Sequence, residues 1–133
     1  MQGESAIVLF SGGLDSTVCL KWAKARFRNI ITIGFDYGQS NQVEMTCRRK
    51  ILDELNHDGE DKVVELNFLK QLCESPLVTA GDSEDKDFGA DAAFVPARNI
   101  LFFTIAGMLA YKKGISELVA GVFQTGYSPY LKE

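Results

Sequence analysis

A short run of small and polar residues interrupts the first apolar stretch of the chain. Residues 11–16 read Ser-Gly-Gly-Leu-Asp-Ser and directly follow the apolar residues 6–10. Glycines let a ligand approach the main chain closely, and backbone N–H groups at the start of a helix attract anions. Ser11, Ser16 and Thr17 can add hydroxyl donors. The chemistry that these residue types suit is the binding of a phosphate group.

Asp15 restricts how such a phosphate can be bound. A carboxylate repels a bare phosphate, so beside one it serves as a helix N-cap or as a ligand of magnesium. The run is neither a Walker A loop nor a Gly-x-Gly-x-x-Gly pattern, which disfavours a kinase or a dinucleotide oxidoreductase. The structural alternative is a tight turn between a strand and a helix, capped by Asp15 or Ser16. The strand and helix expected on either side favour anion binding.

The elements around this turn alternate between strand and helix. Strands are predicted over residues 6–10, 30–35, 62–66 and 116–122. Helices are predicted over residues 15–27, 42–56 and 100–111, with a helical turn over residues 69–73. This alternation predicts an α/β, Rossmann-like fold of three layers, with a parallel sheet of about four to five strands, in a single domain. Ligands of such sheets bind beyond the carboxyl ends of the strands, which is where the candidate motifs lie.

Two of the predicted helices carry patterns that indicate burial. The helix over residues 42–56 has apolar residues at four-residue spacing, which are Val43, Cys47, Ile51 and Leu55. These residues predict a core-facing stripe. Residues 100–111 are the longest strongly apolar run. Because this run is shorter than the roughly 18 to 20 residues of a membrane span, we expect a buried helix.

The composition is that of an ordinary folded domain. Of the 133 residues, 46% are hydrophobic and 24% are charged, which excludes the disordered class. The net charge of -4 offers no basic surplus for nucleic acid, so direct nucleic-acid binding is not expected. No secretory signal is visible because the apolar residues 6–10 follow Glu4, so we expect a cytoplasmic protein without membrane association. Without a Cys-x-x-Cys spacing, the cysteines are expected to be small core residues: Cys19, Cys47 and Cys73.

A polar and acidic stretch covers residues 74–93. Within it, residues 81–93 hold five acidic residues against one lysine. Since so long a stretch without predicted structure is unusual in a compact domain, it is either a solvated mobile loop or a substrate lid, and composition favours the loop.

Four motifs together resemble a known family. Residues 11–16 resemble the pyrophosphatase loop (PP-loop) of ATP-dependent adenylating enzymes such as asparagine, GMP and NAD synthetases, which share the adenine nucleotide alpha hydrolase (HUP-type) fold. In that group the loop holds the pyrophosphate of ATP while a substrate oxygen attacks the α-phosphate. The other motifs are similar to those of the 7-cyano-7-deazaguanine synthase family of queuosine precursor synthesis, and they are Phe35-Asp36-Tyr37-Gly38-Gln39, Phe94-Val95-Pro96-Ala97-Arg98-Asn99, and Gly121-Val122 followed by Thr125 and Ser128.

The resemblance implies an ATP-dependent carbon–nitrogen ligase. It would adenylate 7-carboxy-7-deazaguanine and convert the carboxylate, through an amide, to a nitrile with ammonia. Implied contacts of ATP are Ser11, Gly12, Gly13, Leu14, Asp15, Ser16, Thr17, Asp36, Tyr37, Gly38 and Gln39. Implied contacts of the acceptor substrate are Arg98, Asn99, Gln124 and Thr125. Asp15, as a ligand of Mg²⁺, and Arg98 are the implied catalytic residues.

Simpler interpretations stay open for two of these residues. Arg98, close to Pro96 at an expected helix start, either binds phosphate or carboxylate through two parallel hydrogen bonds from its guanidinium or is an ordinary surface arginine. Asp36 either borders the adenine or caps the next helix. His57 lies in a predicted turn, and we expect no catalytic role for it.

The sequence departs from the family pattern near its carboxyl end. The family carries a glutamate and an aspartate where this chain has Gln124 and Gly126. Because paired carboxylate contacts would recognise a guanine-like edge, two alternatives stay open: a different heterocyclic acceptor, or a nucleotide-binding module without ligase turnover. The family continues into a four-cysteine zinc site whose ligands are absent here, so we expect either an amino-terminal fragment or a naturally short protein. Its fourth strand would leave an uncovered edge, which predicts a homo-oligomer.

Overall fold

Four parallel strands form a sheet in the order β3-β2-β1-β4. The computed structural model describes residues 3–38, 42–72 and 98–121. The strands are β1 (Gly3–Leu9), β2 (Phe27–Asp36), β3 (Asp61–Glu65) and β4 (Leu118–Val119). Since β2 and β4 lie on opposite sides of β1, the strand order reverses at β1, which is where such sheets bind ligands.

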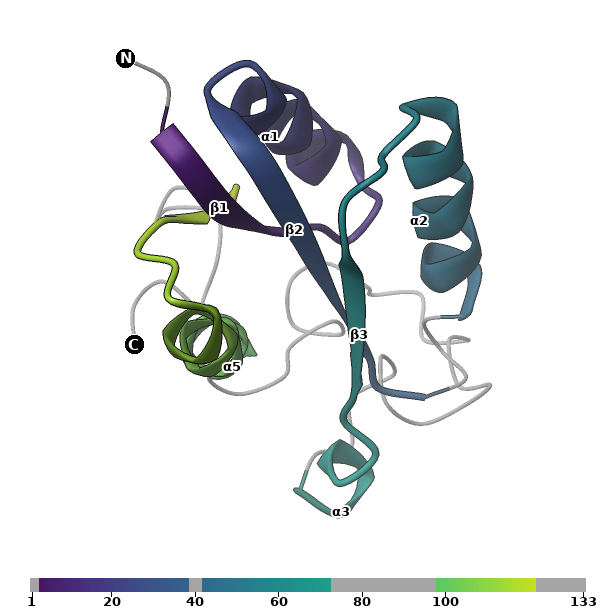
Figure 1. Cartoon of the computed structure of the whole chain (residues 1–133). Helices are drawn as coiled ribbons and strands as arrows, with labels where there is room; N and C mark the ends of the chain where they lie inside the picture. Colours follow the sequence, from purple (N-terminus) through teal and green to yellow (C-terminus); the bar gives the residue numbers. More distant parts are fainter. Residues whose placement is uncertain (1–2, 39–41, 73–97, 122–133) are drawn as a thin grey trace, which may run out of the picture.

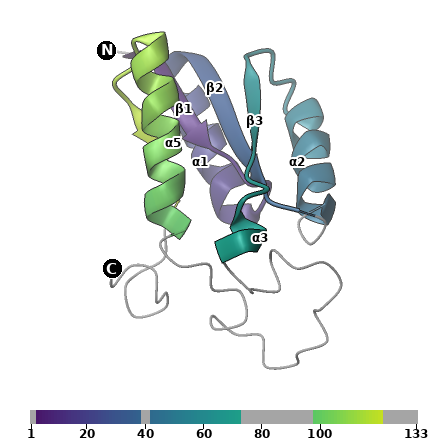
Figure 2. The same cartoon turned by 90° about the horizontal axis from the view of Figure 1, so that it is seen from below.

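The helices cover both faces of this sheet. α1 (Leu14–Lys24) and α2 (Gln42–Glu54) lie over one face, and α5 (Arg98–Lys113) lies over the other (Figure 1). Figure 2 shows the same three layers from below, with the short α3 (Leu69–Leu72) after β3. The α/β, Rossmann-like arrangement predicted from the sequence is therefore confirmed.

The two cores follow from the alternation of side chains along β1. Ile7 packs toward α5 with Ala106, whereas Ala6 and Val8 pack toward α1 with Leu20. All five side chains are fully buried. A central parallel strand is covered on both faces, which is why β1 is apolar throughout its second half instead of alternating with polar residues.

Several predicted boundaries are wrong by a few residues. α1 ends at Lys24 rather than residue 27, because β2 already begins at Phe27, opposite Gly3 of β1. The amino ends of both strands carry polar residues, which concealed them from a search for apolar runs. α2 ends at Glu54, two residues before its predicted end. Of the described residues predicted for the fourth strand, only Leu118–Val119 form a strand.

The stripe predicted for α2 is wrong in its first half, whereas Ile51 and Leu55 are half-buried and pack against the core that α1 shares. Val43 is 78% exposed and Cys47 is exposed, whereas the buried residues of this helix are Arg48 and Leu52. The pattern failed because Arg48 occupies a core position. Arginine is rarely buried unless it has a partner, and the sequence did not reveal one.

Among the described residues, the helix expected to be buried packs against the core through one face only. In α5, Ala106 and Ala110 are buried, but Met108 and Tyr111 are exposed. The prediction that the cysteines are core residues is wrong for Cys47, which is exposed, whereas Cys19 is half-buried. Cys73 and residues 74–93 lie outside the described residues. None of the helices in the described ranges is both long enough and apolar enough for a transmembrane segment.

A buried ion pair holds α2 to the sheet. Arg48 is 1% exposed, and its Nη1 donates to Oδ2 of Asp61 at 2.7 Å while its Nη2 contacts Oδ1. Thr32 in β2 donates its hydroxyl to Oδ1 of the same carboxylate at 2.7 Å. Arg49 adds a second, solvent-exposed contact at 3.2 Å from Oδ2. Asp61 thus receives donors from both α2 and β2, and we call the buried contact the Arg48–Asp61 pair.

Gly34 leaves the space that the buried guanidinium fills. A Cβ atom at Gly34 would lie 2.2 Å from Nε of Arg48, whereas a Cβ at Gly107 in α5 would meet nothing within 4 Å. Gly34→Ala should therefore lower the free energy of unfolding by about 1 to 3 kcal/mol through overpacking. The matched control Gly107→Ala should raise it by about 0.5 to 1 kcal/mol, because alanine favours a helix interior over glycine. Urea unfolding measures both, and equal effects at the two positions would contradict the packing described here.

The Arg48–Asp61 pair should make stability depend on pH. Burial by itself raises the pKa of Asp61, but hydrogen bonds from Arg48 and Thr32 and the charges of Arg48 and Arg49 outweigh it, so the pKa lies below its ordinary value. A carboxyl with a lowered folded-state pKa stabilises the fold above its unfolded-state pKa, and this stabilisation is lost as the pH falls through the folded-state pKa. The stability advantage of the wild type over Asp61→Asn should therefore be constant above about pH 5 and shrink as the pH falls from about 5 to about 2. Urea unfolding across this range checks it, and a constant difference would contradict it.

Candidate functional site

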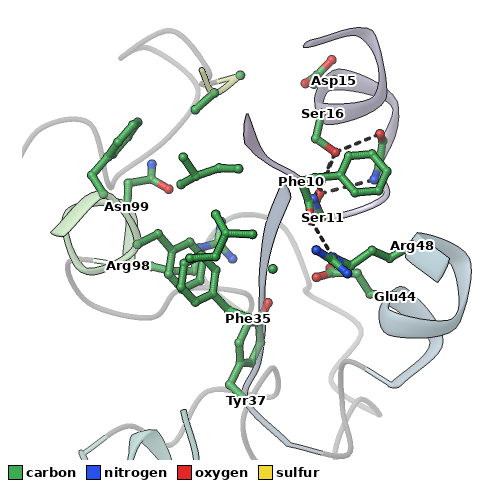
Figure 3. A pocket seen from close by; sticks show the side chains of 18 of the residues that line it. Phe10, Ser11, Asp15, Ser16, Phe35, Tyr37, Glu44, Arg48, Arg98 and Asn99 are labelled. Carbon is green, nitrogen blue, oxygen red and sulfur yellow. Dashed lines mark hydrogen bonds between the residues drawn. The ribbon is translucent and has the colours of Figure 1, made fainter. Parts of the chain in front are cut away.

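A cavity of about 510 Å³ opens beyond the carboxyl ends of β1 and β2. Its walls come from the loop after β1, the first turn of α1, α2, the start of α5 and the residues that follow β4. Figure 3 shows Arg98 and Asn99 on one side of it and Asp15 and Ser16 on the other. The volume lies within the range of small-molecule sites, and the position is the one expected for a ligand of a parallel sheet.

The loop between β1 and α1 folds around the hydroxyl of Ser16. The N–H groups of Ser11 and Gly12 both donate to Ser16 Oγ, at 3.2 and 3.1 Å. The N–H of Gly13 donates to Ser11 Oγ at 3.3 Å. Two backbone donors of the loop therefore converge on Ser16 Oγ at the rim of the cavity, and the third meets Ser11 Oγ, which lies 3.2 Å from it.

Within the described residues, no side-chain hydrogen bond caps the first turn of α1. The N-cap is Gly13, and the hydroxyl of Thr17 donates to the carbonyl of Gly13 at 2.7 Å instead of accepting from an N–H group. The capping by Asp15 or Ser16 that the structural alternative required is therefore absent. Since the first N–H groups of a helix have no partner within the helix, this end of α1 is suited to an anion.

Gly12 is required by the loop for two reasons. Its φ is +93°, in the left-handed region that glycine tolerates best. A Cβ atom at Gly12 would also lie 2.9 Å from Cα of Arg48, so the loop is packed directly against α2.

The side of the cavity formed by α5 combines a cation with aromatic rings. Phe102 stacks on Phe35 with ring centres 4.1 Å apart and an angle of 3° between the planes. The ring centre of Tyr37, which is buried, lies 6.2 Å from that of Phe102. The guanidinium carbon of Arg98 is 6.0 Å from the centre of Phe102. Arg98 is half-buried and lines the cavity, which favours the binding interpretation over that of a surface arginine.

Many of the residues singled out from the sequence meet at this cavity. Those that line it are Ser11, Gly13, Leu14, Asp15, Ser16, Tyr37, Arg98 and Asn99. Gly12 and Thr17 belong to the same loop and helix turn but do not line the cavity. The predicted residues Gln39, Gln124 and Thr125 lie outside the described residues.

Asp36 makes hydrogen bonds near the start of the next helix, which agrees with the capping interpretation. Its Oδ1 accepts hydrogen bonds from the N–H of Gly38 and from Nε2 of Gln42, both at 3.2 Å. The carboxylate therefore links the end of β2 to the first residue of α2, and neither Asp36 nor Gly38 lines the cavity.

Sequence reasoning missed the lining residues of α2 and two of those of α5. Glu44 and Arg48 reach the cavity from α2, and Phe102 and Phe103 reach it from α5. A signal existed for Glu44, because the helix after β2 must begin near the carboxyl edge of the sheet, so its first turn faces the ligand site. Arg48 gave no such signal.

Asp15 is the carboxylate best placed to accompany a metal ion. It is exposed on the first turn of α1 and lines the cavity. In the ranges that the structure describes, no group of three or more histidine, cysteine, aspartate or glutamate side chains could hold a metal by itself. Mg²⁺ often needs only one or two protein carboxylates when a nucleotide supplies phosphate oxygens, so Asp15 fits an ion that arrives with a nucleotide.

The chain after β4 passes close to this carboxylate. A Cβ atom at Gly121 would lie 3.2 Å from Sγ of Cys19 and 3.4 Å from Cβ of Asp15. Burial, and secondarily the charge of Asp15, raise the pKa of the Cys19 thiol, which favours its neutral form. Cys19 therefore acts here as a packing residue beside the loop.

Known proteins of similar sequence share this region. The family model described as queuosine biosynthesis protein QueC matches residues 5–131. A 7-cyano-7-deazaguanine synthase of Nitratidesulfovibrio vulgaris (strain DP4) is 44% identical over 134 residues, which are 95% of this chain and 55% of that protein. The synthases of Leptothrix cholodnii and Burkholderia mallei (strain SAVP1) are 41% and 38% identical, over 96% of this chain and 57% and 55% of theirs. The chain thus spans little more than half the length of these relatives. Because the family match covers nearly the whole chain, the chain belongs to the QueC family of queuosine biosynthesis proteins.

Proposed function

We propose that the chain binds ATP with Mg²⁺ in this cavity and uses it to adenylate a carboxylate, as part of a 7-cyano-7-deazaguanine synthase. The observation that carries the proposal is the loop of residues 11–17: the uncapped first turn of α1 lines a cavity of ligand size, and the N–H groups of Ser11 and Gly12 converge on Oγ of Ser16, which also lines it. The relatives that carry the synthase name support the choice of product.

The loop is suited to the phosphate tail of ATP. The N–H groups at the start of α1 and the hydroxyls of Ser11 and Ser16 would bind its negatively charged oxygens. In adenylation a carboxylate oxygen attacks the α-phosphorus, the bond from that phosphorus to the bridging oxygen of the β-phosphate breaks, and pyrophosphate leaves with the electron pair. A loop that holds the β- and γ-phosphates therefore holds the leaving group and stabilises its charge.

The opposite wall is suited to the acceptor and the reacting phosphate. Arg98 can donate two parallel hydrogen bonds to a carboxylate or to the α-phosphate, which aligns the attack. The stacked rings of Phe35 and Phe102 offer an apolar surface to a flat heterocycle. Mg²⁺ with Asp15 would neutralise charge on the phosphates. Ammonia would then displace AMP from the adenylate to give the amide and release a proton. A second ATP would adenylate the amide oxygen with release of pyrophosphate, and loss of AMP, which carries that oxygen away, and of the two nitrogen-bound protons would leave the nitrile.

A direct assay tests this proposal. The protein is incubated with ATP, magnesium, ammonia and 7-carboxy-7-deazaguanine, and pyrophosphate and nitrile are measured. Both products are expected, and the absence of both would reject the ligase. ATP binding without pyrophosphate release would favour a nucleotide-binding module. Pyrophosphate release with another heterocyclic acid alone would favour a different acceptor, as the presence of Gln124 and Gly126 allows.

The role of Asp15 can be separated from the binding of the phosphates. Asp15→Asn should weaken the affinity for ATP with Mg²⁺ by about tenfold, because the amide cannot balance the charge of the ion. The affinity for ATP in the presence of a chelator should not fall. Calorimetry of both titrations checks this, with Asp53→Asn on the exposed face of α2 as the control. Unchanged Mg²⁺-dependent binding in Asp15→Asn would assign the carboxylate a structural role.

We also propose that copies of the chain associate. Within the described part of the chain, β4 pairs with β1 alone and forms an edge of the sheet. Exposed edges readily pair with other chains. Light scattering should give the mass of at least two chains, and a monomer mass that is independent of concentration would count against association.

A further inference from the structure

We infer that Arg48 is a positioning residue for the phosphate-binding loop and that it acts by holding the peptide group between Phe10 and Ser11. This inference deepens the proposed function and rests on it, because it names the residue that orients a donor of the nucleotide site. Arg48 lies on α2, far from the loop in sequence, and no motif singled it out.

The contact is a hydrogen bond to the main chain at the end of β1. Nε of Arg48 donates to the carbonyl oxygen of Phe10 at 2.9 Å, in a buried position. A peptide group is planar and trans, so the carbonyl of Phe10 and the N–H of Ser11 point in opposite directions within one rigid unit. Fixing the carbonyl therefore fixes the direction of the Ser11 N–H, which points to Ser16 Oγ. A positive donor on the carbonyl also polarises the peptide and strengthens that N–H as a donor.

The guanidinium is itself held in place. Its two Nη atoms contact the carboxylate of Asp61, which Thr32 also holds. The absence of a side chain at Gly34 leaves room for Nε, and Gly12 lies directly against the backbone of Arg48. The side chain is 1% exposed and is surrounded on all these sides. It therefore transmits the position of α2 and β3 to the loop.

This task requires the shape of arginine and not only its charge. Nε donates to Phe10 while the two Nη atoms face Asp61, so one planar group serves two acceptors in different directions. A lysine ammonium opposite Asp61 would keep the buried charges balanced, but it has no second, rigidly placed donor for the carbonyl.

The test is built on a double variant that removes both buried charges. In Arg48→Met with Asp61→Asn, the amide oxygen can still accept from Thr32, and replacing a whole buried pair is tolerated far better than removing one partner. Arg49→Met is the matched control, because Arg49 also contacts Asp61 but is 60% exposed and does not line the cavity. Arg48→Lys is the second variant, and it keeps the charge without the fork.

Two measurements are made on each variant. Amide hydrogen exchange of the nucleotide-free protein should be about tenfold faster at Ser11 and Gly12 in the double variant, with Ile7 and Val8 of β1 still protected. The dissociation constant for ATP with Mg²⁺ should rise by about tenfold. Arg48→Lys should show the same two changes, and Arg49→Met should show neither.

The outcomes separate the inference from the proposed function. If the wild type does not bind ATP, the proposed function fails, and exchange at Ser11 still decides whether Arg48 holds the loop. Unchanged exchange at Ser11 in a folded double variant overturns the inference. If the double variant does not fold, normal exchange and affinity in Arg48→Lys overturn it equally. A loss of protection throughout β1 together with Ser11 would assign Arg48 to general stability and overturn the positioning role.

Discussion

The buried ion pair between Arg48 and Asp61 is the interaction on which the geometry under the cavity depends. The pair joins α2 to the start of β3, and Nε of Arg48 reaches the carbonyl of Phe10 at the end of β1. Burying two charges costs solvation free energy, which is offset only when the charges are close and fully hydrogen-bonded, as they are here with Thr32 and Phe10 as additional partners. The pair therefore fixes the distance between the helix and the loop.

This constraint also explains which glycines the fold needs. Gly34 leaves the volume that the guanidinium fills, and Gly12 lets the loop lie against the backbone of α2. Neither requirement arises from a turn signal alone. Both follow from placing a large, planar, charged group between a helix and the strand ends, where a smaller apolar residue would be usual.

The sequence allowed the architecture to be predicted because the central strands are covered on both faces. A strand such as β1 then appears as a continuous apolar run, and its alternation with helices leaves one reasonable sheet type. The amino end of β1, which begins at Gly3, was not predicted because its residues do not form an apolar run. The first half of the stripe of α2 was misplaced because periodicity assigns burial to apolar residues. The buried position there belongs to Arg48, whose partner Asp61 is in another element.

The candidate site was predictable where its residues are contiguous. The loop from Ser11 to Ser16 has its glycines, hydroxyls and carboxylate in one short run. The position of this run after a strand was therefore enough to predict an anion-binding loop. Glu44 and Phe102 reach the same cavity from two helices, and only the order of the strands brings them together.

The hydroxyl of Ser16 has a consequence for the selectivity of the loop. Two main-chain donors already turn to this oxygen, so an incoming ligand faces an internal competitor for them. An uncharged oxygen would replace one neutral acceptor with another and gain little, whereas an anionic oxygen forms hydrogen bonds roughly twice as strong. The loop is therefore ordered without a ligand. It favours an anionic ligand over a neutral one of the same shape.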